Sequence, residues 1–185
     1  MKRFFDIILS IIVIVFLSIP MLLIMIAIRL SSKGPALYWS DRVGIANSLY
    51  KMPKFRSMRI DTPEVATHLL LNANKFLTPI GGFLRRTSLD ELPQLVNVLT
   101  GNMSLVGPRP LFPEDNEFYD HHYLRRLNVL PGITGLLQIN ERNTSEFETW
   151  YKYDIEYIEN WTLYLDLKII LKTPFSLLKS KTKGI

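Results

Sequence analysis

The stretch Ile7–Ile28 reads IILSIIVIVFLSIPMLLIMIAI, and all of its residues except Ser10 and Ser18 are apolar. About 20 apolar residues suffice for a helix to cross the hydrocarbon core of a bilayer. A cleaved signal peptide has a shorter apolar core and a cleavage site of small residues, whereas this stretch leads directly into Arg29-Leu30-Ser31-Ser32-Lys33. We therefore expect a membrane helix that is retained at the N-terminus.

Two courses through the membrane fit this helix. Pro20 removes a backbone donor inside it and predicts a kink, and Ser18 stands where its hydroxyl can satisfy a freed carbonyl. Basic residues flank both ends, so the positive-inside rule gives no orientation for a span, whereas a helix that enters, bends and returns satisfies both flanks. The flanking residues are Lys2, Arg3, Arg29 and Lys33. A kinked spanning helix and a re-entrant helix both remain open.

The rest of the chain has the pattern of an α+β protein that is mostly helical. Apolar and aromatic runs at Leu37–Trp39 and Tyr50–Phe55 surround Gly44 and predict a hairpin or two small strands. The last predicted helix is amphipathic and has a basic tail, which fits either a core-facing helix or a segment lying on anionic membrane lipid. We favour lipid contact, because a membrane helix is present in the same chain. Helices are expected over residues 62–74, 92–99, 114–130, 147–160 and 163–178.

Charge and residue types narrow the class of partner. The formal net charge of +5 favours an anionic partner such as acidic lipid, nucleotide or nucleic acid. The basic residues are scattered and no recognition helix stands out, so we expect no nucleic-acid partner. With no cysteine and three histidines, thiolate metal sites are excluded and a histidine-rich zinc site is not expected.

Two adjacent carboxylates, Asp90 and Glu91, stand in the segment LRRTSLDELPQL over residues 84–95. Pro93 is tolerated in the first turn of a helix, so the helix is predicted to begin near Asp90. Both carboxylates would then lie at the positive end of a helix dipole, where phosphates also bind. A plain capping box, formed by Ser88 and Glu91, explains the same pattern without any chemistry.

Arginines favour the chemical interpretation. Arg109 is fixed between two prolines, and an arginine held in this way commonly clamps phosphate or carboxylate groups. Two carboxylates beside such cations can both hold Mg²⁺, or one can attack phosphorus as a nucleophile. The spacing leaves these two roles open. The arginines in question are Arg85, Arg86, Arg109, Arg125, Arg126 and Arg142.

With these motifs the chain resembles a known family, the bacterial sugar transferases, which are monotopic polyprenol-phosphate phosphoglycosyl transferases. The motifs occur in the family's order over essentially the whole chain, without the multi-span N-terminal extension of longer relatives, as expected of a minimal catalytic form. The matching segments are KRFFD (2–6), KFRSM (54–58), RRTSLDELPQ (85–94), NVL (97–99), GNMSLVGPRP (101–110), PGITG (131–135) and residues 157–168.

The resemblance implies a ping-pong transfer of a phosphosugar. Asp90 would attack the β-phosphate of a UDP-sugar, release UMP and carry the phosphosugar covalently. The phosphate of undecaprenyl phosphate would then attack this intermediate and give undecaprenyl-diphosphate-sugar, the first step of bacterial surface polysaccharide or glycan assembly. Asp90 would also hold Mg²⁺, with Glu91 assisting metal or phosphate positioning.

The resemblance also assigns cations to the substrates. Arg85 would meet the phosphate of the lipid carrier near the membrane, and Lys54 and Arg109 would lie near the donor phosphates. Arg56 and Arg142 complete the predicted phosphate-binding set. The motif that contains Arg142 departs from the family pattern at Leu137 and Glu141, which weakens any inference about the sugar but not about the reaction class.

For the membrane, the resemblance favours a re-entrant helix over residues 1–30, broken at Ser18 and Pro20, and a cytosolic catalytic domain over residues 31–185. One residue separates this serine from the proline, whereas the family has them adjacent. The expected location is the cytoplasmic face of the bacterial plasma membrane, with membrane lipid and a second copy of the chain, as a homodimer, among the expected partners. A membrane-tethered phosphohydrolase and a non-catalytic membrane adaptor are the alternatives.

Overall fold

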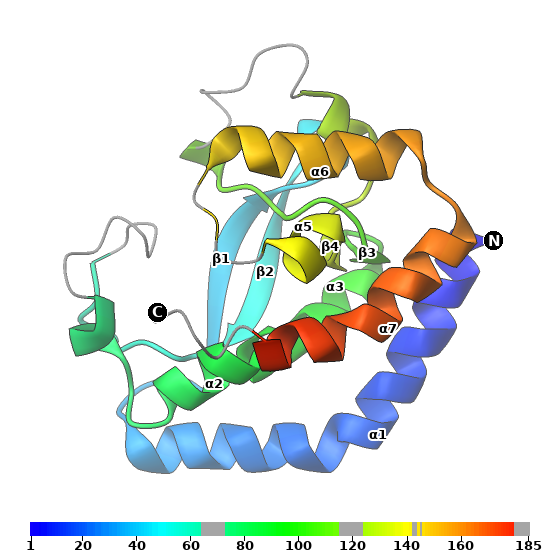
Figure 1. Cartoon of the computed structure of the whole chain (residues 1–185). Helices are drawn as coiled ribbons and strands as arrows, with labels where there is room; N and C mark the ends of the chain where they lie inside the picture. The colour runs from blue at the N-terminus through cyan, green and yellow to red at the C-terminus, as the bar shows by residue number, and fades with distance from the viewer. Residues whose placement is uncertain (64–72, 115–123, 142–143, 145, 180–185) are drawn as a thin grey trace.

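The structure is a computed structural model, and it describes residues 1–63, 73–114, 124–141, 144 and 146–179. The described part is mostly helical with two small sheets, which confirms the predicted α+β class (Figure 1). The helices and strands are α1 (Lys2–Ser31), β1 (Leu37–Val43), η1 (Ile45–Asn47), β2 (Leu49–Phe55), η3 (Ala73–Phe76), α2 (Gly81–Thr87), η4 (Leu89–Gln94), α3 (Leu95–Thr100), β3 (Ser104–Val106), η6 (Arg125–Asn128), β4 (Gly132–Thr134), α5 (Leu136–Asn140), α6 (Phe147–Glu159) and α7 (Leu163–Lys179).

Helix α1 is long and apolar enough to cross a membrane, and it is the one such helix in the described part of the chain. It bends sharply partway along its length (Figure 1). Pro20 lies inside the helix and has no N–H to donate to the preceding turn, so it accounts for a bend. The Ser18 hydroxyl donates a 2.8 Å hydrogen bond to the Val15 carbonyl in that turn. The re-entrant course through a bilayer stays a prediction.

The N-terminus of α1 is bound to the rest of the molecule by buried polar contacts. Asp6 accepts hydrogen bonds from the Ser104 hydroxyl (2.8 Å) and the Leu105 N–H (3.2 Å) on β3. Lys2 forms a 2.6 Å ion pair with Asp166 on α7. The KRFFD segment therefore ties the start of α1 to β3 and α7, two elements about 100 and 160 residues further along the chain.

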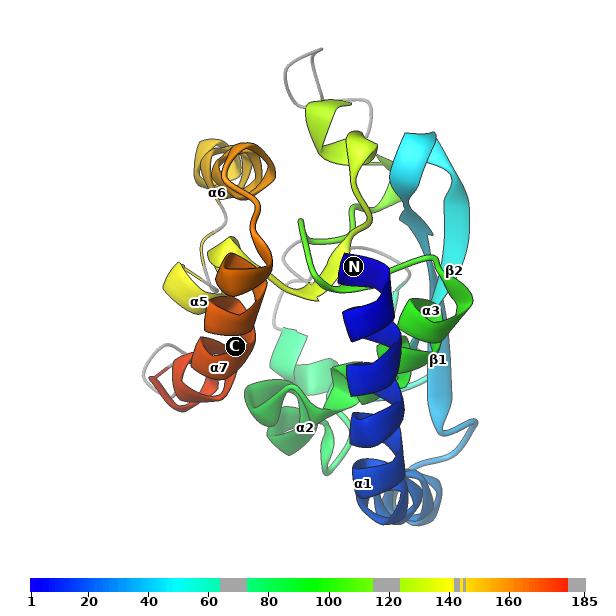
Figure 2. The ribbon, with the colours of Figure 1, turned by 90° about the vertical axis from the view of Figure 1, so that its right-hand side faces the viewer.

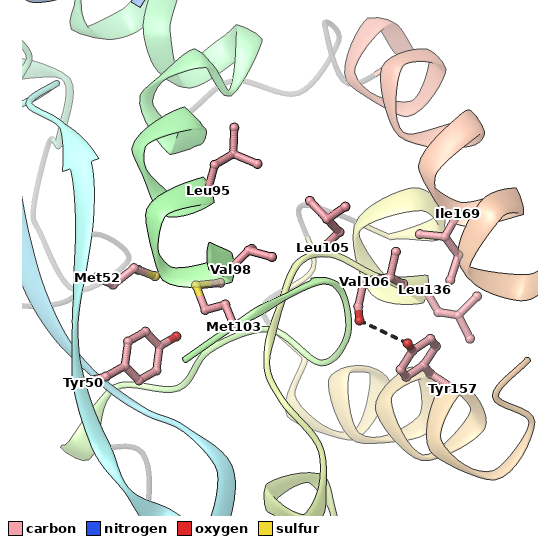
Figure 3. Packing of buried hydrophobic residues seen from close by; sticks show 10 residues of the cluster. All are labelled: Tyr50, Met52, Leu95, Val98, Met103, Leu105, Val106, Leu136, Tyr157 and Ile169. Carbon is pink, nitrogen blue, oxygen red and sulfur yellow. Dashed lines mark hydrogen bonds between the residues drawn. The ribbon is translucent and has the colours of Figure 1, made fainter. Parts of the chain in front are cut away.

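Two short sheets hold the catalytic segments. Strands β1 and β2 form an antiparallel hairpin in which Tyr38 faces Lys54, and β3 and β4 pair in parallel. In the view of Figure 2, the hairpin lies to the right of α1, and α6 and α7 lie to its left. The main hydrophobic core joins these groups of elements, and within it the Tyr157 hydroxyl donates to the Val106 carbonyl at 3.1 Å (Figure 3).

A second hydrophobic cluster packs the C-terminal half of α1 against the hairpin and α2. Ile28 of α1, Phe55 of β2 and Leu84 of α2 are each no more than 1% exposed. Because every one of the three comes from a different element, the end of α1 has a fixed position relative to the hairpin and α2. This contact places the end of α1 next to β2 and α2, the elements that carry Lys54 and Arg85.

Most of the predicted elements are found. The hairpin is confirmed with longer strands, the helix expected over 92–99 occurs as η4 followed by α3, and the helices expected over 147–160 and 163–178 are α6 and α7. Helix α2 was not predicted, because the glycine pair Gly81-Gly82 indicated an interruption of regular secondary structure. The helices expected over 62–74 and 114–130 lie largely outside the described residues; the named elements that overlap their described parts are the short 3₁₀ turns η3 and η6.

Candidate active site

A pocket of about 590 Å³ lies between the hairpin, the α2–η4 segment and the loop after β3. Pockets of this volume are typical of small-molecule sites. Arg142, the fifth of the predicted phosphate-binding residues, lies outside the described part of the chain. The other predicted residues all line this pocket, namely Lys54, Arg56, Arg85, Asp90, Glu91 and Arg109.

Backbone conformation at Ser88 places the two carboxylates. Ser88 has φ 55° and ψ 18°, in the left-handed region, and it separates α2 from η4. The capping-box interpretation is wrong, because Ser88 makes no side-chain cap hydrogen bond. Glu91 instead accepts a 3.0 Å hydrogen bond from Lys54 on β2. The tight turn therefore presents Asp90 and Glu91 to the hairpin.

Asp90 is a buried carboxylate, 8% exposed, in a cationic pocket. Burial raises its pKa from 3.8 to about 6, and the charge of Glu91 adds to this rise, while Lys54 and Arg85 oppose it. The carboxylate is thus mostly ionised at neutral pH but poorly solvated. A desolvated anion next to fixed cations is suited to attack an electrophile that the same cations bind.

Arg85 and Arg56 differ in how they are held. Arg85 donates from Nε to the Ser57 hydroxyl at 2.9 Å, and burial lowers its pKa while the charges of Asp90 and Glu91 oppose that change. Arg56 is 5% exposed and donates from Nη2 to the backbone and side-chain oxygens of Ser32, at 3.0 and 2.8 Å. Arg56 therefore also ties the exit of α1 to β2, and its phosphate-binding role stays a prediction.

The loop that carries Arg109 is supported from behind by a buried ion pair. Arg126 donates to the Arg109 carbonyl at 2.6 Å and pairs with Asp154 of α6 at 2.9 Å. Both side chains of the pair are 4% exposed. Burial raises the pKa of Asp154 to about 6, and the charge of Arg126 opposes the rise. The pair fixes the backbone on which the exposed Arg109 side chain stands.

Glycines bring the motif segments into backbone contact. A Cβ on Gly132 would overlap the backbone nitrogen of Gly107, and a Cβ on Gly135 would overlap the Gly107 carbonyl oxygen. The Gly107 N–H donates to the Thr134 carbonyl at 2.9 Å. The GPRP and PGITG motifs thus pair through their main chains, which requires residues without side chains at these positions.

Among the pocket residues that sequence reasoning missed are Arg42, Phe112 and Gln94. The Arg42 guanidinium stacks 3.2 Å from the centre of the Phe112 ring, and both line the pocket. Gln94 is 3% exposed and also lines it. Arg42 was missed because the polar residues Ser40, Asp41 and Arg42 interrupt the apolar pattern of the strand. Phe112 could have been considered a candidate, because it follows the GPRP motif by two residues.

The carboxylates suit Mg²⁺ bound together with a substrate. Mg²⁺ is commonly held by one or two carboxylates and completed by phosphate oxygens and water. In the described residues no group of three or more acidic, histidine or cysteine side chains is placed to hold a metal alone. Asp90 and Glu91 therefore fit a cation that a diphosphate brings with it rather than a closed structural site.

Comparison with known proteins agrees with this geometry. The family model described as bacterial sugar transferase matches residues 1–180, and the chain belongs to this family. It is 42% identical over 184 residues to the UDP-glucose:undecaprenyl-phosphate glucose-1-phosphate transferase of Escherichia coli K12, with 95% of this chain and 39% of that protein covered. It is 39% identical over 188 residues to the undecaprenyl-phosphate galactose phosphotransferase of Salmonella typhimurium LT2, with 94% and 39% covered.

A shorter relative is matched over most of its length. The exopolysaccharide production protein ExoY of Rhizobium meliloti 1021 is 37% identical over 188 residues, with 93% of this chain and 83% of that protein covered. The chain thus spans about two fifths of the length of the first two relatives and most of the third.

Proposed function

We propose that the protein transfers a phosphosugar from a UDP-sugar to undecaprenyl phosphate, giving undecaprenyl-diphosphate-sugar and UMP. The observation that carries the proposal is a buried, ionisable Asp90 in one pocket with Lys54, Arg85 and Arg109. The names of two relatives supply the substrate class, since they join glucose or galactose phosphate to undecaprenyl phosphate. The exopolysaccharide role of a third supports a place at the start of surface-glycan assembly.

The chemistry runs in two balanced steps. In the first, an Asp90 carboxylate oxygen attacks the β-phosphorus of the donor, the bond from this phosphorus to the bridging oxygen breaks, and UMP leaves with the bonding electrons. In the second, a phosphate oxygen of the acceptor attacks the same phosphorus, and the bond to the Asp90 oxygen breaks. The carboxylate is regenerated, so neither step needs an external oxidant or reductant.

The cations bind and orient the phosphates. Lys54, held at 3.0 Å by Glu91, and Arg109, on the loop fixed by Arg126, serve the donor diphosphate. Arg85, held by Ser57, serves the acceptor phosphate. When bound to Asp90 and Glu91, Mg²⁺ would supply further charge neutralisation to the diphosphate.

The membrane arrangement follows from exposed apolar surface. Helix α7 exposes Tyr164, Leu167, Leu171 and Phe175 at helical spacing, and its opposite face includes the buried Ile169. We infer that the exposed face and the bent α1 contact the same bilayer, with the catalytic domain on the cytoplasmic face, where UDP-sugars are available. A spanning α1 is the alternative that topology mapping of both of its ends would reveal.

A product assay separates transfer from hydrolysis and from mere binding. Purified wild type, Asp90→Asn and the surface control Asp41→Asn are mixed with Mg²⁺ and UDP-sugars labelled in the sugar, with and without undecaprenyl phosphate. Transfer predicts UMP and lipid-extractable label with wild type and Asp41→Asn, and neither with Asp90→Asn. Water-soluble sugar phosphate formed without acceptor would mean a phosphohydrolase, and no turnover of any donor would favour an adaptor.

A further inference from the structure

A second hollow lies where the end of α1 meets the start of β1. It is an open groove of about 480 Å³. Met25, Ile26 and Leu30 of α1 form one wall, and Ala36 and Leu37 form the other. Each of these five residues is apolar, and Arg29 is the charged residue that lines the groove. An apolar groove lined by one cation is suited to bind an amphiphile that has an anionic head group.

The groove adjoins the catalytic pocket. Pro35 and Leu37 line both hollows. The wall between them is firmly placed, because Leu37 and Met25 pack against the buried cluster of Ile28 and Phe55. A molecule with its tail in the groove therefore reaches the catalytic pocket past Leu37, on the side where Arg56 and Arg85 line the pocket.

Positive charge marks this path. Arg29 is exposed, and within the described residues its guanidinium makes one long contact, 3.4 Å, to the Gly34 carbonyl. Arg29 also lies close enough to Arg56 for its charge to add to the burial that lowers the pKa of that guanidinium. The cations therefore extend from the rim of the apolar groove to the phosphate site beside Asp90, which is the order of groups needed by a prenyl phosphate.

We propose that this groove binds the phosphate-proximal isoprene units of the acceptor and delivers the acceptor phosphate to Asp90. This inference rests on the proposed function, because it assigns the tail of that same acceptor to a particular surface. Membrane phospholipid is the competing occupant: acyl chains would also cover apolar residues of α1. Acyl chains would not require the groove to adjoin the catalytic pocket through Pro35 and Leu37.

Photocrosslinking tests the location directly and needs no turnover. The full chain is reconstituted in phosphatidylglycerol nanodiscs with a polyprenyl phosphate that carries a diazirine in its phosphate-proximal isoprene unit. We expect crosslinks within residues 25–37 that excess undecaprenyl phosphate suppresses and that extra phosphatidylglycerol leaves unchanged. Crosslinks located elsewhere, or suppressed equally by both lipids, would overturn the proposal.

A matched pair of substitutions tests the groove in the reaction. Ile26→Trp fills it, whereas Leu23→Trp places the same side chain on an exposed position of the same helix that does not line the groove. We expect Ile26→Trp to slow acceptor-dependent discharge of the phosphosugar about tenfold through a raised acceptor KM. We expect Leu23→Trp to behave as wild type in both half-reactions.

The two proposals fail in different ways. Equal discharge rates in Ile26→Trp and Leu23→Trp, with crosslinks outside the groove, would refute the proposed role of the groove but not the proposed phosphosugar transfer. Absence of any lipid-linked product from wild type would refute the proposed phosphosugar transfer itself. Donor-dependent UMP release serves as the folding control for both variants, because it takes place before the acceptor is needed.

Discussion

Replacing Asp90 by asparagine should stabilise the protein while abolishing its chemistry. Burial and the neighbouring Glu91 charge raise the Asp90 pKa from 3.8 to about 6. At about 1.4 kcal/mol for each pH unit, the ionised carboxylate costs the folded state about 3 kcal/mol at neutral pH. An asparagine side chain would occupy nearly the same volume without the charge, so this cost disappears.

The effect has a defined pH dependence. Because the pKa of Asp90 is higher in the folded state than in the unfolded state, its ionisation lowers the free energy of unfolding. This loss is small below pH 3.8, grows between pH 3.8 and about 6, and is constant above that. The gain from Asp90→Asn should therefore be small at about pH 4 and complete at about pH 8. For a chain of this size about 3 kcal/mol corresponds to a rise in Tm of roughly 6–12 °C.

Thermal unfolding in detergent, with a chelator to remove Mg²⁺, measures this gain at both pH values. Asp41→Asn is the matched control, because Asp41 is half exposed and pairs with the exposed Lys51; its Tm should change little at either pH. An Asp90→Asn variant that is no more stable than wild type at the higher pH, or equally more stable at the lower one, would refute the assignment of Asp90 as a desolvated anion.

Further consequences concern packing, support of the loop and pH. Gly81→Ala should destabilise by about 1–3 kcal/mol in denaturant titrations, because a Cβ there would overlap the Ser57 carbonyl oxygen, whereas Gly82→Ala has room and should cost little. Arg126→Met should cost about 3–5 kcal/mol by the same measurement, since it leaves a buried carboxylate unpaired; an unchanged midpoint would show that the pair does not support the loop. The rate of UMP release without acceptor should fall as pH drops through about 6, where Asp90 takes up a proton because its pKa is raised; a rate unchanged down to about pH 5 would contradict the nucleophile.

Elements with a strong local pattern were predictable from the sequence. The hydrophobic stretch of α1, the acidic-aromatic α6 and the amphipathic α7 each carry their signal within a single helix. The hairpin was predicted too short because Ser40, Asp41 and Arg42 break the apolar pattern. Ser40 and Arg42 are buried and line the pocket, so the local rule failed where the strand contributes to the candidate site.

The site itself was predicted in part. Asp90, Glu91 and the cations could be found because they lie in compact motifs. The supporting contacts could not, because each joins residues far apart in sequence: Asp6 with Ser104, Lys2 with Asp166, and Arg126 with Asp154. Nothing local to Asp154 distinguishes it from the other acidic residues of α6. Only the packing of α6 against η6, which carries Arg126, gives it a role.

The central claim, a covalent phosphosugar on Asp90, is tested most directly by intact-protein mass spectrometry. The detergent-solubilised protein is mixed with Mg²⁺ and each of a panel of UDP-sugars, without undecaprenyl phosphate. We predict a mass gain of one phosphosugar with the correct donor, its loss on adding undecaprenyl phosphate, and its absence from Asp90→Asn. Lipid-dependent UMP release from wild type with no adduct at any time would contradict the claim, and would mean direct transfer between the two substrates.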